Sequence, residues 1–146
     1  MRPIIVIGSL NMDLVIQAQR APQAGETIAA QAFTTIPGGK GANQAVAAAR
    51  LSNGSKGSSK VRMVGRVGSD GFGAQMVHNL EGEGIDITQV QQLPGISTGV
   101  ALIIVEQSGE NRIMIVPGAN GLLAARDIEN LEKLIASAGL VLLQFE

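Results

Sequence analysis

The chain has 146 residues, of which 45% are apolar and 16% charged, and its formal net charge is −1. This length fits one ordinary domain, and this apolar fraction is enough to build a hydrophobic core. With no basic run, no Trp and no Tyr, the chain lacks both the charge and the stacking platforms of a nucleic-acid surface. The absence of Cys excludes a disulfide framework and a cysteine zinc site.

The first apolar run, residues 4–7, is shorter than the roughly 7–15 residues of a signal-peptide core. No apolar stretch approaches the roughly 18 residues that would suggest a membrane span. We therefore expect a cytoplasmic protein with no membrane and no nucleic-acid partner.

Residues 4–7 (IIVI) form a continuous β-branched run, which predicts a strand buried on both faces of a parallel sheet. Residues 13–19 and 27–36 alternate apolar and polar residues loosely, and the turn sequence APQAG lies between them. They predict a hairpin-like pair with one face in water. The Ala-rich residues 41–51 predict a helix that can lie close to a sheet, because its side chains are small.

Residues 52–60 read SNGSKGSSK, a polar and low-complexity segment that we interpret as a tolerated loop insertion. After it, residues 61–67 predict a strand and residues 73–81 a short helix. Residues 99–106 and 112–116 flank the turn sequence SGEN and predict a second hairpin.

Residues 124–137 carry apolar side chains at helical spacing, and residues 140–145 begin another buried strand. The alternation of strands and helices predicts an α/β layer. The last predicted strand has no helix after it to cover the sheet, so we interpret the fold as incomplete.

Two polar side chains follow the first predicted strand, where ligands of open α/β sheets usually bind. Asn11 and Asp13 are two residues apart and would point the same way if this segment is extended. A carboxylate and an amide together offer acceptors and donors suited to vicinal hydroxyls. An Asx-type turn remains an equal alternative.

The sequence PGGKGAN forms a glycine-rich loop that runs into the alanine helix, where free backbone N–H groups would make a polar cradle. Lys40 lies near the positive end of this helix dipole, so a nearby anion or carboxylate would explain its position. A solvated lysine is the alternative. The loop lacks the spacing of a Walker-type phosphate loop.

Other candidate features have simpler interpretations. Residues 65–71 lack the G-x-G spacing of a dinucleotide fingerprint and are typical of a strand-to-helix turn. His78 has no acid or nucleophile at a helical neighbour position, which favours a surface or packing role. We expect Met63, Met76 and Met114 to fill the core.

Six blocks follow one another along the chain: GSLNMD, PGGKGANQAVAAARL, GRVGSDGFG, STGVALI, GENRIMIVPGAN and LLQFE. Because of these blocks, the chain resembles the N-terminal half of ribokinase and its sugar-kinase relatives. The resemblance extends from about residue 4 to residue 146. The resemblance implies a doubly wound ribokinase-like α/β core, incomplete here, with a small β-sheet lid made from approximately residues 12–36 and 99–117. In that family the lid also joins two copies in a homodimer.

The resemblance implies a sugar site in which Asn11 and Asp13 bind hydroxyls and four residues of the glycine loop surround the ring. The implied substrate-binding residues are Asn11, Asp13, Gly38, Gly39, Lys40, Asn43 and, at the end of the sugar, Glu146. Less directly, Ala101 and Ile115 would supply the apolar wall of the lid.

The implied activity is transfer of the γ-phosphoryl group of ATP to a sugar hydroxymethyl group, with D-ribose as the substrate of the most similar family members. The family uses an Asp base in a GAGD segment together with Mg²⁺ and a monovalent cation, K⁺. That segment does not occur in this chain, so we expect no catalytic residue here, and ATP and both cations should need the C-terminal half. Asp13 is a poor substitute base, because a carboxylate bonded to hydroxyls need not be in line with a phosphate.

Two alternatives come from other classes. The chain could be a non-catalytic sugar-binding or dimerisation module derived from a sugar kinase. A nicotinamide-dependent oxidoreductase is suggested only by the α/β alternation and the glycine loops, and it lacks the expected fingerprint. Because amide, carboxylate and ammonium groups bind the hydroxyls of many sugars, the identity of the sugar stays open.

Overall fold

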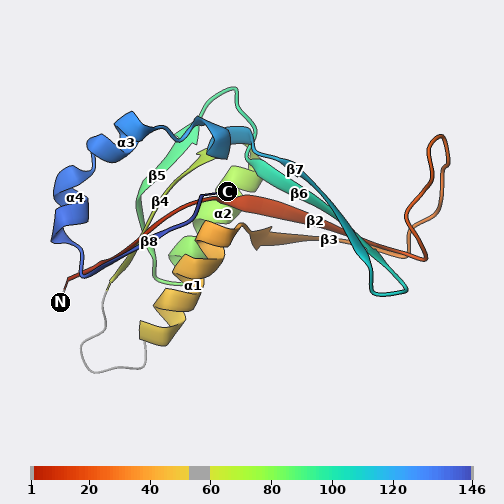
Figure 1. The fold of residues 1–146 in the computed structure, drawn as a ribbon, viewed down its shortest axis with the longest axis horizontal. Helices are drawn as coiled ribbons and strands as arrows, with labels where there is room; N and C mark the ends of the chain where they lie inside the picture. The colour runs from red at the N-terminus through yellow and green to blue at the C-terminus, as the bar shows by residue number, and fades with distance from the viewer. Residues whose placement is uncertain (1, 53–59, 146) are drawn as a thin grey trace.

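A computed structural model describes residues 2–52 and 60–145 of the chain (Figure 1). It contains two four-stranded sheets, with strand orders β5-β4-β1-β8 and β3-β2-β6-β7. The predicted α/β class is confirmed. Most of the predicted loop at 52–60 and the candidate residue Glu146 lie outside the described residues.

The first sheet is entirely parallel, and its strands are β1 (Ile4–Ile7), β4 (Val61–Gly68), β5 (Asp86–Leu93) and β8 (Leu140–Leu143). Strand β1 is central and pairs with β4 on one side and β8 on the other. Its side chains alternate between two cores, because Val6 belongs to one apolar cluster while Ile5 and Ile7 belong to the other. This arrangement explains the unbroken β-branched run, since both faces of the strand are buried.

Helices cover both faces of this sheet, as the prediction of a doubly wound core requires (Figure 1). On one face lie α1 (Lys40–Ser52) and α2 (Gly71–Gly82), and on the other lie α3 (Ala125–Glu129) and α4 (Glu132–Ser137). Helix α1 buries Ala42, Ala45 and Ala49. Their small side chains let the helix approach the sheet closely, as the sequence predicted.

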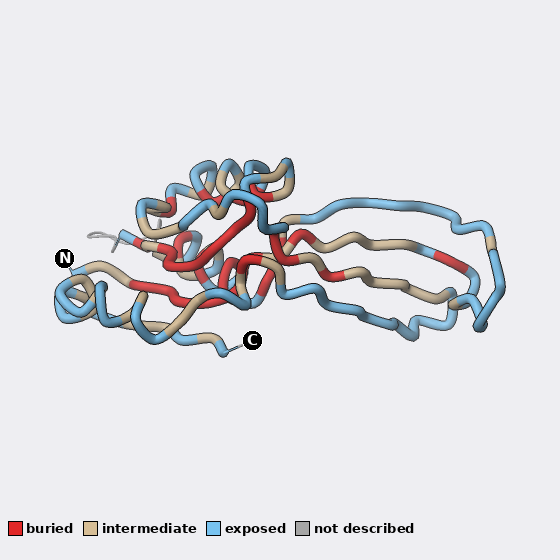
Figure 2. Tube along the Cα trace, turned by 90° about the horizontal axis from the view of Figure 1, so that it is seen from above, coloured by how far each residue is buried: buried red, intermediate tan, exposed pale blue. Residues whose placement is uncertain are grey.

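The second sheet joins the two predicted hairpins. Its strands are β2 (Asn11–Ala18), β3 (Ala32–Gly38), β6 (Gly99–Glu106) and β7 (Asn111–Val116). Strands β2 and β3 are antiparallel, β6 and β7 are antiparallel, and the parallel pairing of β2 with β6 links the hairpins. This sheet extends away from the core, and its outer strands β3 and β7 are exposed along nearly their whole length (Figure 2).

A polar network at Asp70 and Thr98 holds the start of β6 against the core. Asp70 caps α2 by accepting from the Gly73 N–H at 2.8 Å, and it also accepts from the backbone N–H and hydroxyl of Thr98 at 2.8 and 2.6 Å. Burial alone would raise the pKa of Asp70, but these hydrogen bonds outweigh it and lower the pKa. Residues 65–71 therefore run from the end of β4 through a turn at residues 69–70 into α2, as predicted, and Asp70 of this turn holds Thr98 at the start of the second sheet.

Three predictions were wrong or incomplete. The predicted helix at 124–137 is two short helices, because the chain breaks at Asn130, a poor helix former. Strand β5 was not predicted, since its apolar Ile87, Val90 and Leu93 recur every third residue and do not alternate. Met63 and Met76 are fully buried, whereas Met114 is 60% exposed on β7.

Among the described residues, no helix is both long and apolar enough to cross a membrane. His78 lies on the exposed face of α2, in agreement with its interpretation as a surface residue.

Candidate functional site

A cavity of about 440 Å³ lies between the second sheet and the start of α1. Strand β2, the glycine loop, strands β6 and β7, and the 3₁₀ turn η1 (Gly118–Leu122) all contribute to it. Its lining residues are Ser9, Asn11, Asp13, Gly39, Lys40, Asn43, Ala101, Ile103, Ile113, Ile115, Pro117 and Asn120. The cavity therefore unites five of the seven candidate site residues that the sequence singled out.

Asn11 and Asp13 lie on the cavity side of β2, and Met12 between them is fully buried on the other side. This alternation is that of an extended strand. The alternative interpretation of this segment as an Asx-type turn is therefore wrong. The strand places an amide and a carboxylate side by side at one edge of the cavity.

The Asp13 carboxyl is half-buried, and this burial raises its pKa above the ordinary value. Gly38 lies directly behind it on β3, where an added Cβ would collide with the carboxylate. Gly38 does not line the cavity, in contrast to its predicted place around the ring. Its contribution is the space that lets the Asp13 side chain sit beside β3.

Two glycines allow the loop to approach the end of β1 closely. Gly39 has φ +93°, a left-handed conformation that favours glycine, and an added Cβ would lie 2.6 Å from the Asn11 backbone nitrogen. At Gly41, an added Cβ would lie 2.6 Å from the carbonyl carbon of Gly8. The glycine-rich sequence is thus required by backbone packing around the cavity.

Two of the amides that we expected to be free have partners within the chain. The Ala42 N–H donates to the Ser9 carbonyl at 3.0 Å, and the Asn43 N–H donates to the Gly39 carbonyl at 2.8 Å. The start of α1 therefore offers the cavity chiefly the side chains of Lys40 and Asn43, both of which are exposed and line it. These side chains provide an ammonium group and an amide to the same cavity as the carboxylate of Asp13.

We expect Gly41→Ala to destabilise the chain by about 2 kcal/mol or more, because the new methyl group meets backbone atoms that cannot move aside. Gly82→Ala is the matched control in α2, where nothing lies within 4 Å of the added Cβ. Alanine there should be neutral or stabilise by about 0.5–1 kcal/mol. Urea unfolding of both variants measures the difference, and equal midpoints would contradict the close approach at Gly41.

The wall of the cavity opposite α1 is apolar. Ala101 and Ile115 line it as the resemblance implied, and Ile103 and Ile113, two residues away on the same strand faces, complete it. The period of two in each strand could have identified this second pair. An apolar wall facing polar groups is typical of a site for a sugar, which has both apolar C–H faces and hydroxyl edges.

Sequence reasoning missed Asn120, which lies in η1 and lines the cavity 109 residues after Asn11. Its side chain accepts from the Leu10 N–H and donates to the Leu10 carbonyl, both at 2.9 Å. It also donates to Asn11 Oδ1 at 2.8 Å. The only sequence signal was its place in the block GENRIMIVPGAN.

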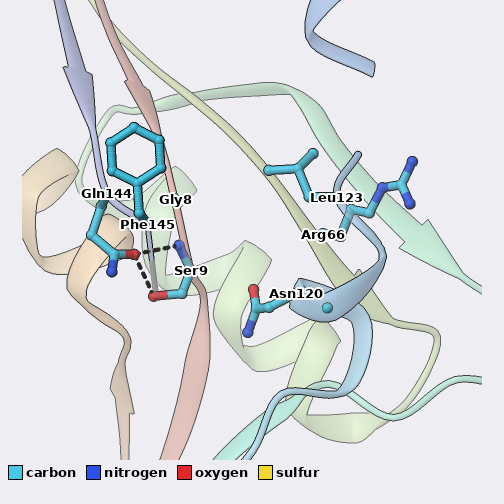
Figure 3. A pocket seen from close by; sticks show the side chains of 8 residues that line it. Gly8, Ser9, Arg66, Asn120, Leu123, Gln144 and Phe145 are labelled. Atoms are coloured by element: carbon cyan, nitrogen blue, oxygen red, sulfur yellow. Dashed lines mark hydrogen bonds between the residues drawn. The ribbon is translucent and has the colours of Figure 1, made fainter. Parts of the chain in front are cut away.

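Ser9 and Asn120 also line a neighbouring cavity of about 290 Å³, shown in Figure 3. There Gln144 Oε1 accepts from the backbone N–H and the hydroxyl of Ser9, at 3.0 and 2.8 Å. Arg66 is buried beside it, paired with Asp127 at 2.6 Å and bonded to the Leu122 carbonyl. The Gln144 contacts join the segments that follow β8 and β1, and the Arg66 contacts join β4 to η1 and α3.

Residues 1–144 match the pfkB family of carbohydrate kinases. The chain belongs to this family. It is 46% identical over 145 residues to a ribokinase of Schizosaccharomyces pombe, and the match covers 98% of this chain and 45% of that protein. It is 43% identical over 143 residues to a deoxyribokinase of Salmonella typhi, with 98% and 45% covered.

Solved structures of ribokinases are also similar to this chain. The chain superposes on a ribokinase from Giardia lamblia with a TM-score of 0.86 at 36% identity, covering 99% of this chain and 45% of that one. Against Arabidopsis thaliana ribokinase complexed with ribose and ATP, the TM-score is 0.81 at 35% identity, with 98% and 45% covered. The predicted ribokinase-like core is confirmed as a partial one, and the oxidoreductase alternative is wrong. The chain spans about half the length of the relatives it matches.

Proposed function

We propose that this chain is the sugar-binding half of a kinase that transfers the γ-phosphoryl group of ATP to the hydroxymethyl group of a pentose, and that the chain alone is inactive. The observation that carries the proposal is the single cavity in which Asn11, Asp13, Lys40 and Asn43 converge. Phosphoryl transfer depends on positioning and charge stabilisation, and the GAGD segment that would supply the base is absent from the sequence.

The chemistry of the cavity supports a polyol ligand. The Asp13 carboxylate accepts hydrogen bonds, Lys40 donates them, and the amides of Asn11 and Asn43 add further polar groups. Adjacent hydroxyl groups need such a mixture, because each hydroxyl both donates and accepts. The apolar wall of Ala101, Ile103, Ile113 and Ile115 would cover the C–H face of the ring. We infer that Glu146, which lies outside the described residues, binds the far end of the sugar.

D-Ribose is the sugar that we propose, with ribose 5-phosphate as the product. Several of the relatives are ribokinases, and one related structure contains ribose and ATP. A deoxyribokinase is 43% identical, so 2-deoxyribose is the closest competing substrate. Comparing the affinities for these two sugars therefore addresses specificity directly.

ATP, Mg²⁺ and K⁺ are the cofactors that the family implies. Within residues 2–52 and 60–145, no three His, Cys, Asp or Glu side chains cluster in a way that could hold a metal ion. We propose, as the resemblance implies, that all three cofactors need the C-terminal half of the enzyme for binding.

We propose that the second sheet acts as a lid over the sugar and as the contact between two copies in a homodimer. Its outer strands expose Phe33 and Ile36 on β3 and Met114 and Val116 on β7, each at least half exposed and none of them among the residues that line the sugar cavity. A monomer gains nothing from leaving so many apolar side chains in water, whereas a second copy would cover them.

Calorimetric titration of the 146-residue chain with D-ribose tests the proposal. We expect saturable binding of one sugar per chain, because the cavity has both its polar and its apolar wall within the chain. Binding without any ATP turnover is the result that the proposal expects of the isolated chain, whereas ATP turnover by this chain alone would contradict it. Failure to bind any pentose or hexose would contradict the assignment of the cavity.

A further inference from the structure

The amide of Asn120 has only one possible orientation. Its Oδ1 lies 2.9 Å from the Leu10 N–H, which can only donate, and its Nδ2 lies 2.9 Å from the Leu10 carbonyl, which can only accept. Exchanging the two atoms would place donor against donor and acceptor against acceptor. The backbone of Leu10 therefore fixes which atom of Asn120 is nitrogen.

This orientation determines that of Asn11 as well. The second N–H of Asn120 Nδ2 points at the Asn11 side chain across 2.8 Å, so the Asn11 atom that faces it must be the acceptor, Oδ1. Gly99 makes the contact possible, because an added Cβ there would collide with both Asn120 Nδ2 and Asn11 Oδ1. Residues from β2, β6 and η1 thus meet at one hydrogen bond.

We propose that Asn120 is a positioning residue that makes Asn11 a hydrogen-bond donor toward the sugar. Since Oδ1 is engaged by Asn120, the group that Asn11 has left for the cavity is Nδ2, with its two N–H bonds. Asp13, two residues along the same strand face, can only accept when ionised. Asn11 followed by Asp13 therefore presents a donor and then an acceptor.

This order of donor and acceptor specifies how a hydroxyl binds. A sugar oxygen can accept from Asn11 Nδ2 while its own proton is donated to Asp13, and each bond polarises the other favourably. A group that only accepts or only donates satisfies one of the two side chains. The inference rests on the proposed function, since it specifies how the same cavity recognises its sugar.

The orientation can be tested without any ligand, by nuclear magnetic resonance of the wild-type chain. The Asn120 side-chain amide protons should exchange slowly with water and show cross-peaks to the Gly99 Hα protons. The Asn11 side-chain amide protons should show clearly weaker cross-peaks to Gly99, because Oδ1 is the Asn11 side-chain atom nearest to it. Strong cross-peaks from the Asn11 amide protons to Gly99 would overturn the proposal, whether or not the chain binds ribose.

A double-mutant cycle, in which the affinity for D-ribose is measured, tests whether Asn120 acts through Asn11. We expect Asn120→Ala to weaken binding about ten-fold in the wild-type chain and less than about two-fold in the Asn11→Ala variant, because Asn120 acts through Asn11. A purely structural role would weaken both backgrounds equally and would overturn the proposal. Asn111→Ala, at the exposed start of β7, is the control that should bind like wild type. If the wild-type chain binds no sugar, the proposed function fails, while the resonance measurement still decides the orientation.

Discussion

The 146-residue chain alone should show no phosphorylation of D-ribose by ATP above background, whereas its fusion to the C-terminal portion of the Schizosaccharomyces pombe ribokinase should be active. We expect a difference of at least about a thousand-fold, because the catalytic base and the charge-stabilising groups enter only with the second portion. The two chains are 46% identical over the N-terminal 45% of that enzyme, so the sugar cavity should be compatible with its new partner. A coupled assay of ADP formation measures the difference.

The seam for such a fusion lies at β8, which pairs with β1 on one side and exposes Leu140 and Leu143 by about half. A continuing chain can cover these side chains and extend the sheet. The C-terminal portion of the yeast enzyme alone is the control and should be inactive, since it lacks the cavity. Turnover by the 146-residue chain at the rate of the fusion would contradict the proposal that the catalytic groups lie in the C-terminal portion.

Replacing Asp13 by Asn should weaken D-ribose binding by about 10–150-fold, the range expected when hydrogen bonds to a charged group are lost. The replacement keeps the size of the side chain and its place beside Gly38, so the fold should be unaffected. It removes the only carboxylate among the residues that line the described part of the cavity. Calorimetry measures the affinity, and an unchanged affinity would remove Asp13 from the site.

The pH dependence of binding provides a second readout for the same group. The ionised carboxylate is the form that accepts from two hydroxyls, so affinity should be full above the pKa of Asp13 and fall as the pH drops through it. Because burial raises this pKa, the loss should begin at a higher pH than for an exposed aspartate. The Asp13→Asn variant should lack this dependence.

Local patterns predicted the elements whose side chains follow one simple period. The β-branched run of β1, the alanines of α1 and the second hairpin appear where expected, because burial on both faces or on one face leaves a distinct signature. The first hairpin is also present, but its second strand, β3, begins at Ala32, five residues later than predicted. Strand β5 has no such signature. Among the described strands it is an edge strand that pairs with β4, through an irregular register near Arg62, and its Ile87 and Val90 pack against the core.

The sequence could predict cavity residues that are close together along the chain, but it could not predict contacts between residues that are far apart along it. Asn11 and Asp13 could be placed together, since a strand puts alternate residues on one face. The hydrogen bond between Asn11 and Asn120 spans 109 residues and depends on how β6 delivers η1 to the end of β2. No local pattern contains that information, because tertiary packing creates the contact.

The most direct test of the central claim is to map where D-ribose binds, by following the backbone amide resonances of the chain during a titration. We predict that the shifted resonances cluster at Asn11, Asp13, Lys40 and Asn43, around the cavity between β2 and α1. Shifts confined to the neighbouring cavity at Leu123 and Gln144, or an absence of shifts at millimolar sugar, would contradict it.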